Sequence, residues 1–170
     1  MDAITELRRF DDTQLHEDIA VLAKRYCDLI DDSRKGRGLW LREVARLLPR
    51  LHAAMASVDG ADRRLGLPAA VDLDARFDLY TRLRHELADR DSYWLEFDCA
   101  GEGSDAMTGS LADDLTDIYC ELKEGLGLLD VDPRDALAAW SSGYARHWGQ
   151  HLIDAERHLA LLGAQERLEI

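Results

Sequence analysis

The sequence predicts an all-α fold: a single-domain bundle of about five helices with a long C-terminal helix. Apolar residues recur every three or four positions along most of the chain, and no segment shows the alternation and turn residues that indicate a β-hairpin. A length of 170 residues suits one domain with its own core, which we expect to occupy about residues 12–163 of the chain 1–170.

The first helix should begin near Asp12 or Thr13 and end in the polar segment at residues 31–38. A second helix is expected at about residues 39–57, and Pro49 lies inside it. Because proline lacks an amide donor and crowds the preceding turn, we expect a kink or a break there.

A third helix is predicted at about residues 74–88, with an inward face formed by Phe77, Tyr80, Leu83 and Leu87. The next segment, "YWLEF" at residues 93–97, is either a strand or an extended connector. The glycine-rich residues that follow, about 98–109, should form a mobile loop.

The last two helices have clear starting points. Ser110 can cap the free amides of the fourth helix, with an acidic residue three positions later. Asp132 can cap the fifth helix, where Pro133 takes the first position, at which a missing amide donor costs nothing. This helix can extend to Gly163, about 30 residues or roughly 45 Å, with a bend allowed at residues 141–143.

Charge is unevenly distributed along the chain. Residues 1–70 carry 12 acidic and 12 basic side chains, whereas residues 71–170 carry 22 acidic and 9 basic ones and account for the whole net charge of −13. Because binding to phosphate backbones needs Lys and Arg, this balance argues against a nucleic-acid partner. It is compatible with a basic protein partner or with divalent cations, although charge that maintains solubility is the simpler explanation.

Nothing in the sequence predicts export or a membrane span. The N-terminus lacks the apolar segment of a secretory signal, and no apolar run approaches the roughly 18 residues of a membrane helix. The three cysteines, Cys27, Cys99 and Cys120, lie far apart and lack the CxxC spacing of a zinc knuckle. We therefore expect a cytoplasmic protein with reduced thiols and no membrane partner.

The segment "HWGQHLIDAERH", residues 147–158, carries a histidine stripe, which we define as His147, His151, Asp154 and His158. At about 100° per residue the four lie within about 60° of one another. They border an apolar face formed by Trp148, Leu152, Ala155, Leu159 and Leu162. Such residues can share a metal ion with acids of a second helix. They can also be boundary residues that hydrogen-bond neighbouring helices, or a proton-handling site, because histidine titrates near neutrality.

The predicted fourth helix carries an acidic stripe, which we define as Asp113, Asp117, Glu121 and Glu124, with Asp114 beside it. Like charges four residues apart destabilise a helix, so a cation or arginines from another helix should offset them, unless the face is simply solvated. Carboxylates with histidines suit zinc, manganese or iron better than magnesium. We expect this helix to pack beside residues 147–158, in a polar seam that is more often hydrogen-bonded structure than a metal site.

Arg42, Arg46 and Arg50 follow one another at four-residue spacing on the predicted second helix. They can bind an anion or the acidic face of a partner, but we favour the simpler interpretation that they are solvated or meet the acidic stripe within the molecule. The sequence contains no dinucleotide-binding glycine motif, no phosphate-binding loop and no nucleophile elbow, so no enzyme class is indicated by a motif.

Four segments resemble the bacterial domain of unknown function 5063 family: "LLPRLHAAM", "DSYWLEFD", "DDLTDIYCELKEGL" and "HWGQHLIDAERHLALL". The last two are the more specific, and the resemblance extends over roughly residues 15–162. His52 stands where the family tends to have tyrosine, and Cys99 stands where proline is expected. The resemblance implies a small, cytoplasmic, mostly helical bacterial protein. It implies no activity, because none is established for the family.

These observations favour a non-enzymatic protein–protein interaction module. Its partner is expected to be a protein, and the acidic charge is compatible with a basic one. We expect no cofactor. An alternative is a metal-binding protein or metal-dependent hydrolase that uses a divalent metal held by Asp113, Asp114, Asp117, Glu121, His147, His151, Asp154 and His158. A third hypothesis, an immunity- or antitoxin-like inhibitor of a basic nuclease, rests on charge alone. The oligomeric state has no signature in the sequence.

Overall fold

The part of the chain that the computed structural model describes comprises residues 3–33, 38–58, 72–95 and 107–169. Side chains are described from Gln14 onward, apart from that of Met107. The predicted all-α, single-domain bundle with a long C-terminal helix is confirmed. Its elements are α1 (Ala3–Asp31), α2 (Trp40–Ala56), α3 (Leu73–Leu87), the 3-10 helix η1 (Ala88–Arg90), α4 (Leu111–Leu129), α5 (Pro133–Gly143), the π-helical turn η2 (Tyr144–Trp148) and α6 (Gly149–Ala164).

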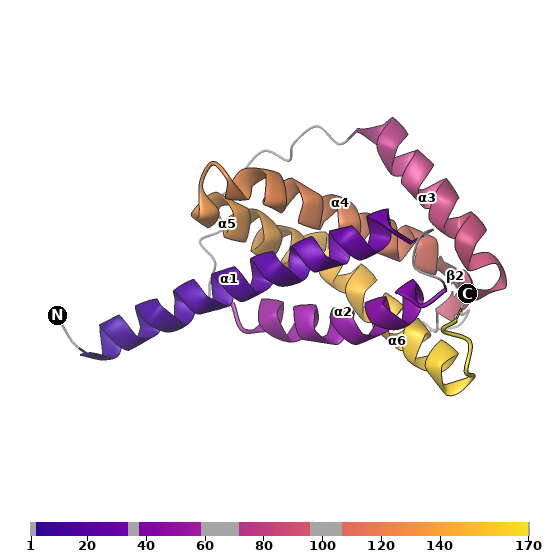
Figure 1. Cartoon of the computed structure of the whole chain (residues 1–170), viewed down its shortest axis with the longest axis horizontal. Helices are drawn as coiled ribbons and strands as arrows, with labels where there is room; N and C mark the ends of the chain where they lie inside the picture. Colours follow the sequence, from indigo (N-terminus) through magenta and orange to yellow (C-terminus); the bar gives the residue numbers. More distant parts are fainter. Residues whose placement is uncertain (1–2, 34–37, 59–71, 96–106, 170) are drawn as a thin grey trace, which may run out of the picture.

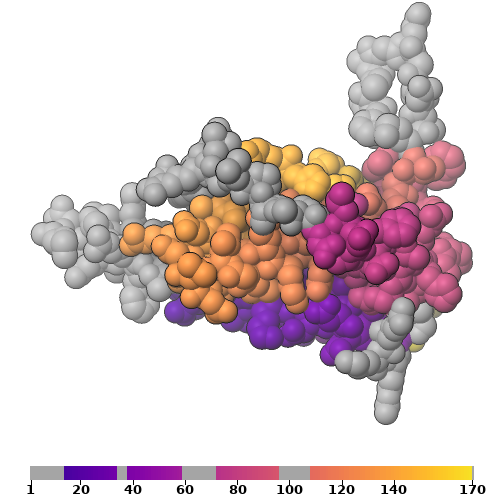
Figure 2. All heavy atoms as spheres, turned by 90° about the horizontal axis from the view of Figure 1, so that it is seen from above, coloured from indigo at the N-terminus to yellow at the C-terminus, as the bar shows by residue number. Residues whose placement is uncertain are grey.

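Helix α4 lies at the centre of the bundle, where it packs against α1, α3, α5 and α6 (Figure 1). Helix α2 packs against α1 and α6. Seen from above, α1, α3 and α4 meet on one face of the molecule (Figure 2). One core joins these helices, and its largest fully buried side chains include Trp140, Trp148 and Tyr26. All five residues predicted for the apolar face beside the histidine stripe are buried in it.

Helices α4 and α5 begin where the sequence predicts. Ser110 Oγ accepts a hydrogen bond from the amide of Asp113 at 3.3 Å, and Asp132 accepts one from the first turn of α5 at 2.8 Å. A second acid reinforces the start of α4, because the buried Asp91 accepts from the Ala112 amide at 2.8 Å and from the Ser110 hydroxyl at 2.9 Å. Asp91 thereby fixes the strand that follows it against the first turn of α4.

That strand belongs to a hairpin that the sequence analysis did not predict. Strand β1 (Ser92–Leu95) pairs antiparallel with β2 (Met107–Ser110). Each strand has four residues, which is too short for a convincing alternation. Of the two readings of "YWLEF", the strand is the one present in its described part. Of the predicted mobile loop, residues 98–106 lie outside the described residues and residues 107–109 belong to β2.

The hairpin places Tyr93 directly over Gly109. The two residues are paired across the strands, and a Cβ atom at Gly109 would lie 2.3 Å from Cζ of the tyrosine. The missing side chain therefore lets the Tyr93 ring cross β2, with only 8% of the residue exposed.

Three details of the helices differ from prediction. Helix α1 begins at Ala3, ahead of the predicted start at Asp12 or Thr13, because strong helix formers precede these two residues. Helix α2 runs through Pro49 without a break, held by buried leucines on both sides of it. Phe77, predicted to face inward, is 65% exposed, and Leu79 is buried instead. The reason is that α3 packs along α4, so only one narrow side of its apolar face is covered.

A π-helical turn separates α5 from α6, directly after the bend allowed at residues 141–143. The Gly149 amide donates to the Tyr144 carbonyl, five residues back, as the wider turn requires. A Cβ atom at Gly149 would lie 2.3 Å from that carbonyl oxygen, so glycine is needed there. Such turns occur frequently at functional sites, and this one contains His147.

Candidate functional site

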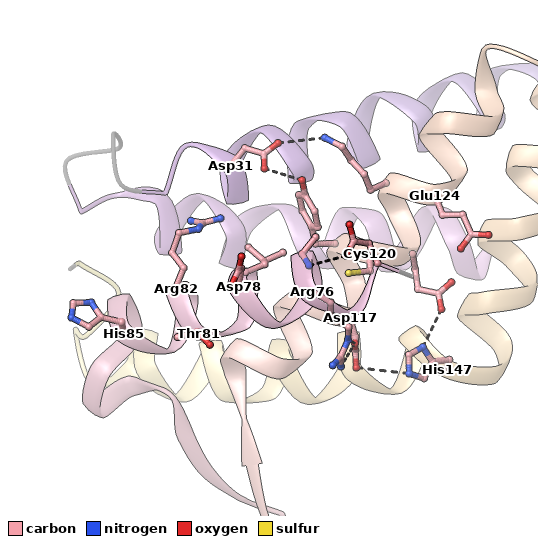
Figure 3. A pocket seen from close by; sticks show the side chains of 16 residues that line it. Asp31, Arg76, Asp78, Thr81, Arg82, His85, Asp117, Cys120, Glu124 and His147 are labelled. Atoms are coloured by element: carbon pink, nitrogen blue, oxygen red, sulfur yellow. Dashed lines mark hydrogen bonds and ion pairs between the residues drawn. The ribbon is translucent and has the colours of Figure 1, made fainter. Parts of the chain in front are cut away.

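The acidic stripe of α4 and the histidine stripe face each other, because α4 packs against both η2 and α6. His151 Nδ1 lies 2.9 Å from Asp114 Oδ1, and His147 Nδ1 lies 3.1 Å from Glu121 Oε1. The expected polar seam is therefore present. Figure 3 shows His147 beside Asp117, to which a dashed line joins it.

The environment of His151 is unusual because both ring nitrogens face a carboxylate. While Nδ1 contacts Asp114, Nε2 lies 3.2 Å from Asp117 Oδ2. If Nδ1–H donates to Asp114 in a neutral ring, the lone pair of Nε2 points at the Asp117 oxygen. Such a contact is favourable only if Nε2 also carries a proton or a cation lies between the two atoms. An imidazolium that bridges Asp114 and Asp117 satisfies both contacts, and so would a cation between Nε2 and Asp117.

The second histidine repeats this arrangement around the same oxygen. His147 Nε2 lies 3.8 Å from Asp117 Oδ2, and the two imidazole rings meet edge to face at 5.1 Å. We call His147, His151 and Asp117 the His–Asp triad; one ligand atom from each lies within 4.8 Å of the others. Ligands about 2.0–2.1 Å from a tetrahedral metal are roughly 3.3 Å apart. The 3.2 Å contact of His151 matches that spacing, whereas the 3.8 Å contact of His147 would have to shorten for both rings to hold one ion.

Arg76 of α3 holds the third member of the triad. Its Nε and Nη2 atoms donate to Asp117 Oδ1 at 2.9 and 2.5 Å, which leaves Oδ2 directed at the histidines. Nη2 also donates to Asp113 at 3.3 Å. The bond to Asp117 raises the pKa of the guanidinium above its usual value. Arg76 is therefore the arginine that offsets the repulsion within the acidic stripe.

A tyrosine and a buried carboxylate orient His151 from the other side. The Tyr93 hydroxyl donates to Asp114 Oδ2 at 2.5 Å, while Asp114 Oδ1 faces the imidazole. Burial raises the pKa of Asp114, and bonds to His151 and Tyr93 counteract this effect. The hydrogen bond to Asp114 raises the pKa of His151. Burial likewise raises the pKa of Tyr93, which keeps its hydroxyl protonated as a donor.

Two members of the histidine stripe lie apart from the triad. Asp154 accepts a hydrogen bond from Gln150 of its own helix at 3.0 Å. His158 is buried, stacks on Tyr93 at 4.7 Å between ring centroids, and its Nε2 lies 2.7 Å from the Arg90 carbonyl. His158 therefore packs against Tyr93 and takes no part in the triad. Of the histidine stripe, only His147 and His151 face Asp117.

The arginines of α2 do not meet the acidic stripe. Arg42 pairs with Glu169, and Arg46 pairs with Glu43 at 2.7 Å. Arg50 forms no ion pair with any described residue. Arg42 and Arg46 therefore pair within the molecule but not with α4, because α2 packs against α1 and α6.

A pocket of about 1030 Å³ opens between α3 and α4, with the end of α1 at one side. Asp117, Glu121 and His147 belong to its lining, so two members of the triad, Asp117 and His147, form part of the pocket wall (Figure 3). His147 is half exposed, whereas Asp117 is 7% exposed. The triad therefore joins a buried carboxylate to an open space large enough for a small molecule.

Sequence reasoning did not find Arg76 and Tyr93. Arg76 reaches α4 from a helix 41 positions earlier, and Tyr93 reaches it from the unpredicted hairpin. No local spacing relates either residue to the stripes. The only sign was the repulsion along α4, which required a cation without indicating its origin.

The family model described as Domain of unknown function (DUF5063) matches residues 11–165. The chain belongs to this family. Among solved structures, it is similar to the crystal structure of protein BF1032 from Bacteroides fragilis, a structural genomics target. That match has 20% identity and a TM-score of 0.69, and it covers 84% of this chain and 88% of the other. The likeness shows the fold.

None of the curated proteins compared with this chain matches it. In the described part of the chain, no helix is both long enough and apolar enough to cross a bilayer.

Proposed function

We propose that this protein binds a divalent transition-metal ion through the His–Asp triad. The observation that carries the proposal is that both imidazoles direct Nε2 at one carboxylate oxygen while a second carboxylate faces each Nδ1. Histidine ligands in metalloproteins commonly donate their other ring nitrogen to a carboxylate, which fixes the tautomer and the ring orientation. Asp114 and Glu121 supply that support here.

The ligand types favour zinc or iron over magnesium and calcium, which prefer oxygen ligands alone. Three protein ligands leave at least one coordination position open, as in catalytic rather than structural centres. A metal in such a site lowers the pKa of a bound water to about 7 and so supplies hydroxide at neutral pH. Metal-dependent hydrolysis is accordingly the activity that this arrangement supports best.

The test uses metal-stripped protein titrated with Zn²⁺, Mn²⁺ and Co²⁺, with elemental analysis of the protein as purified. At about 100 times Kd, a metal should stabilise the fold by roughly 2.7 kcal/mol, a rise in Tm of about 5–11 °C that EDTA reverses. The variants His147→Ala and His151→Ala should lose this rise. His85→Ala, an exposed histidine outside the triad, is the matched control and should keep it.

Absence of bound metal together with an unchanged Tm would overturn the proposal. So would an equal response of all three variants. The orienting carboxylates give a finer measure, because loss of such a partner weakens metal affinity by about 10–100-fold. Glu121→Gln should show that loss without removing a ligand atom.

The second candidate is a protein–protein interaction module. The excess of acidic side chains in residues 71–170 favours it. Against this, Asp113, Asp114, Asp117 and Glu121 all have partners within the chain, so these carboxylates are already engaged. Affinity purification from native lysate that recovers no partner above background would count against this candidate, and a basic nuclease among the recovered proteins would favour the inhibitor hypothesis.

A further inference from the structure

Helices α2 and α6 pack side by side on the side of the bundle away from α3 (Figure 1). His52 of α2 and Glu156 of α6 form an ion pair at 2.9 Å, which marks the line of contact between the two helices. We call the exposed residues of Trp40–Ala56 and Gly149–Ala164 the α2–α6 face. The residues that line the 1030 Å³ pocket all lie outside this face.

The α2–α6 face has no acidic side chain, although acidic residues outnumber Lys and Arg by 34 to 21 in the chain. Its only charged residues are Arg46, Arg50 and Arg157, and the others are alanine, glycine, proline, isoleucine, leucine and one glutamine. The three acids of the two helices are partly buried and have partners: Glu43 pairs with Arg46 at 2.7 Å, Asp154 accepts from Gln150 at 3.0 Å, and Glu156 pairs with His52. The face is therefore positively charged on a protein whose net charge is −13.

An apolar strip follows the line of contact between the two helices. At about 100° per residue, Pro49 lies about 60° from His52 on the exposed side of α2. On α6, Ile153 and Ala160 lie about 60° and about 40° from Glu156, also on the exposed side, and Ile153 is 45% exposed. Apolar residues that are contiguous on a surface, unlike isolated ones, indicate a binding site.

Arginines lie on both sides of this apolar strip. Arg50 is about 160° from His52 on α2, and Arg157 is about 100° from Glu156 on α6. Arg157 Nη2 donates to the Trp94 carbonyl at 2.8 Å, which holds its guanidinium at the edge of the face. Neither Arg50 nor Arg157 pairs with a carboxylate in the part of the chain that the structure describes.

The surface that complements this face is an amphipathic helix with acidic residues on both sides of its apolar stripe. The small side chains of the strip allow a third helix to approach closely, and its carboxylates then meet Arg50 and Arg157. A second copy of the chain does not fit in this way, because a twofold contact places the same face on itself and brings arginine against arginine. Three arginines are also few for a phosphate backbone.

We propose that the α2–α6 face binds an acidic amphipathic helix of a partner protein. The interaction requires neither the pocket nor a metal ion, so it goes beyond the proposed function. It also differs from the second candidate function, in which the acidic charge of the chain favours a basic partner.

The probe is a fluorescein-labelled synthetic helix of about 18 residues, matched to the length of α6, with leucine and alanine on one side and glutamate on both flanks. One comparison peptide has lysine at every glutamate position, and another has the glutamate sequence scrambled so that the apolar stripe is lost. In fluorescence anisotropy with the full chain, the glutamate peptide should bind at least tenfold more tightly than either, although the net charge favours the lysine peptide. Added salt should weaken its binding.

Charge reversal tests the arginines. Arg50→Glu and Arg157→Glu should each weaken binding of the glutamate peptide about two- to fivefold, as expected for exposed ion pairs. The double variant should bind the lysine peptide more tightly than the glutamate peptide. Arg134→Glu, an exposed arginine of α5 outside the face, is the matched control and should bind as the parent does.

Three results would each overturn the proposal: no binding of the glutamate peptide, equal binding of the scrambled peptide, or equal effects of Arg134→Glu and Arg157→Glu. Binding to phosphatidylglycerol vesicles without binding to the glutamate peptide would assign the face to a lipid surface and overturn it as well. The peptide should bind EDTA-stripped and Zn²⁺-treated protein equally. Failure of the metal proposal therefore leaves this one standing, and failure of the peptide to bind leaves the metal proposal untouched.

Discussion

Two glycines of α4, two residues apart, should respond to alanine in opposite directions. A Cβ atom at Gly125 would lie 2.0 Å from Trp140 Nε1, in an indole that is 1% exposed and donates to the Leu122 carbonyl at 3.2 Å. Moving this ring costs about 1–3 kcal/mol for overpacking and about 0.5–1.5 kcal/mol for the strained hydrogen bond. The higher helix propensity of alanine offsets about 1 kcal/mol of this cost, so the free energy of unfolding should fall by roughly 1–3 kcal/mol.

Gly127 is the matched control, because nothing lies within 4 Å of its Cβ position and the residue is exposed. Gly127→Ala should therefore stabilise the protein by up to about 1 kcal/mol. For a chain of this length, thermal unfolding followed by circular dichroism should show Tm lower by roughly 2–12 °C for Gly125→Ala and higher by roughly 2–4 °C for Gly127→Ala. A Gly125→Ala protein as stable as the parent would refute the packing argument.

Three further predictions concern the buried polar groups. In metal-free protein, the pKa of His151, measured by NMR, should lie above 6.5, and it should fall in the Asp114→Asn variant. The stability that the His151–Asp114 pair contributes is fully present below pH 6.5 and is lost as the pH rises through the raised pKa. Tyr93→Phe should lower the free energy of unfolding in urea by about 1.5–3 kcal/mol, whereas Tyr80→Phe should not. Cys27, whose pKa burial raises to about 12, should resist iodoacetamide at pH 8 until the protein unfolds, as peptide mapping would show; labelling of the native protein contradicts its burial.

Local chemistry made part of the fold predictable. The starts of α4 and α5 depend on Ser110 and Asp132, whose side chains bond amides two or three residues away, so a short segment contains all the necessary information. The hairpin depends on Asp91 and on Gly109 lying beneath Tyr93, which are relations between strands far apart in the chain. Helical periodicity also identified the apolar face of α3 but not which side of it α4 covers, and so Phe77 was misplaced.

The candidate site shows the same division. Spacing on a helix predicted which carboxylates and histidines share a face, because both stripes are periodic within one segment. Whether Asp117 meets His147 and His151 depends on how α4 and α6 pack, and the fit of Arg76 depends on a third helix. Periodicity gives no distances between helices. The polar seam was therefore predictable, but the convergence of His147, His151 and Asp117 was not.

The π-helical turn also sets the rotational phase of the whole C-terminal segment. Trp140 and Trp148 are both buried although eight residues separate them, and eight residues of ideal α-helix would turn the second tryptophan about 80° away from the first. The wide turn absorbs one residue, and the remaining seven leave an offset of only about 20°. If this turn were regular α-helix with all its residues kept, α6 would be rotated by about 100° relative to α5, which would expose the buried face and carry His151 away from α4.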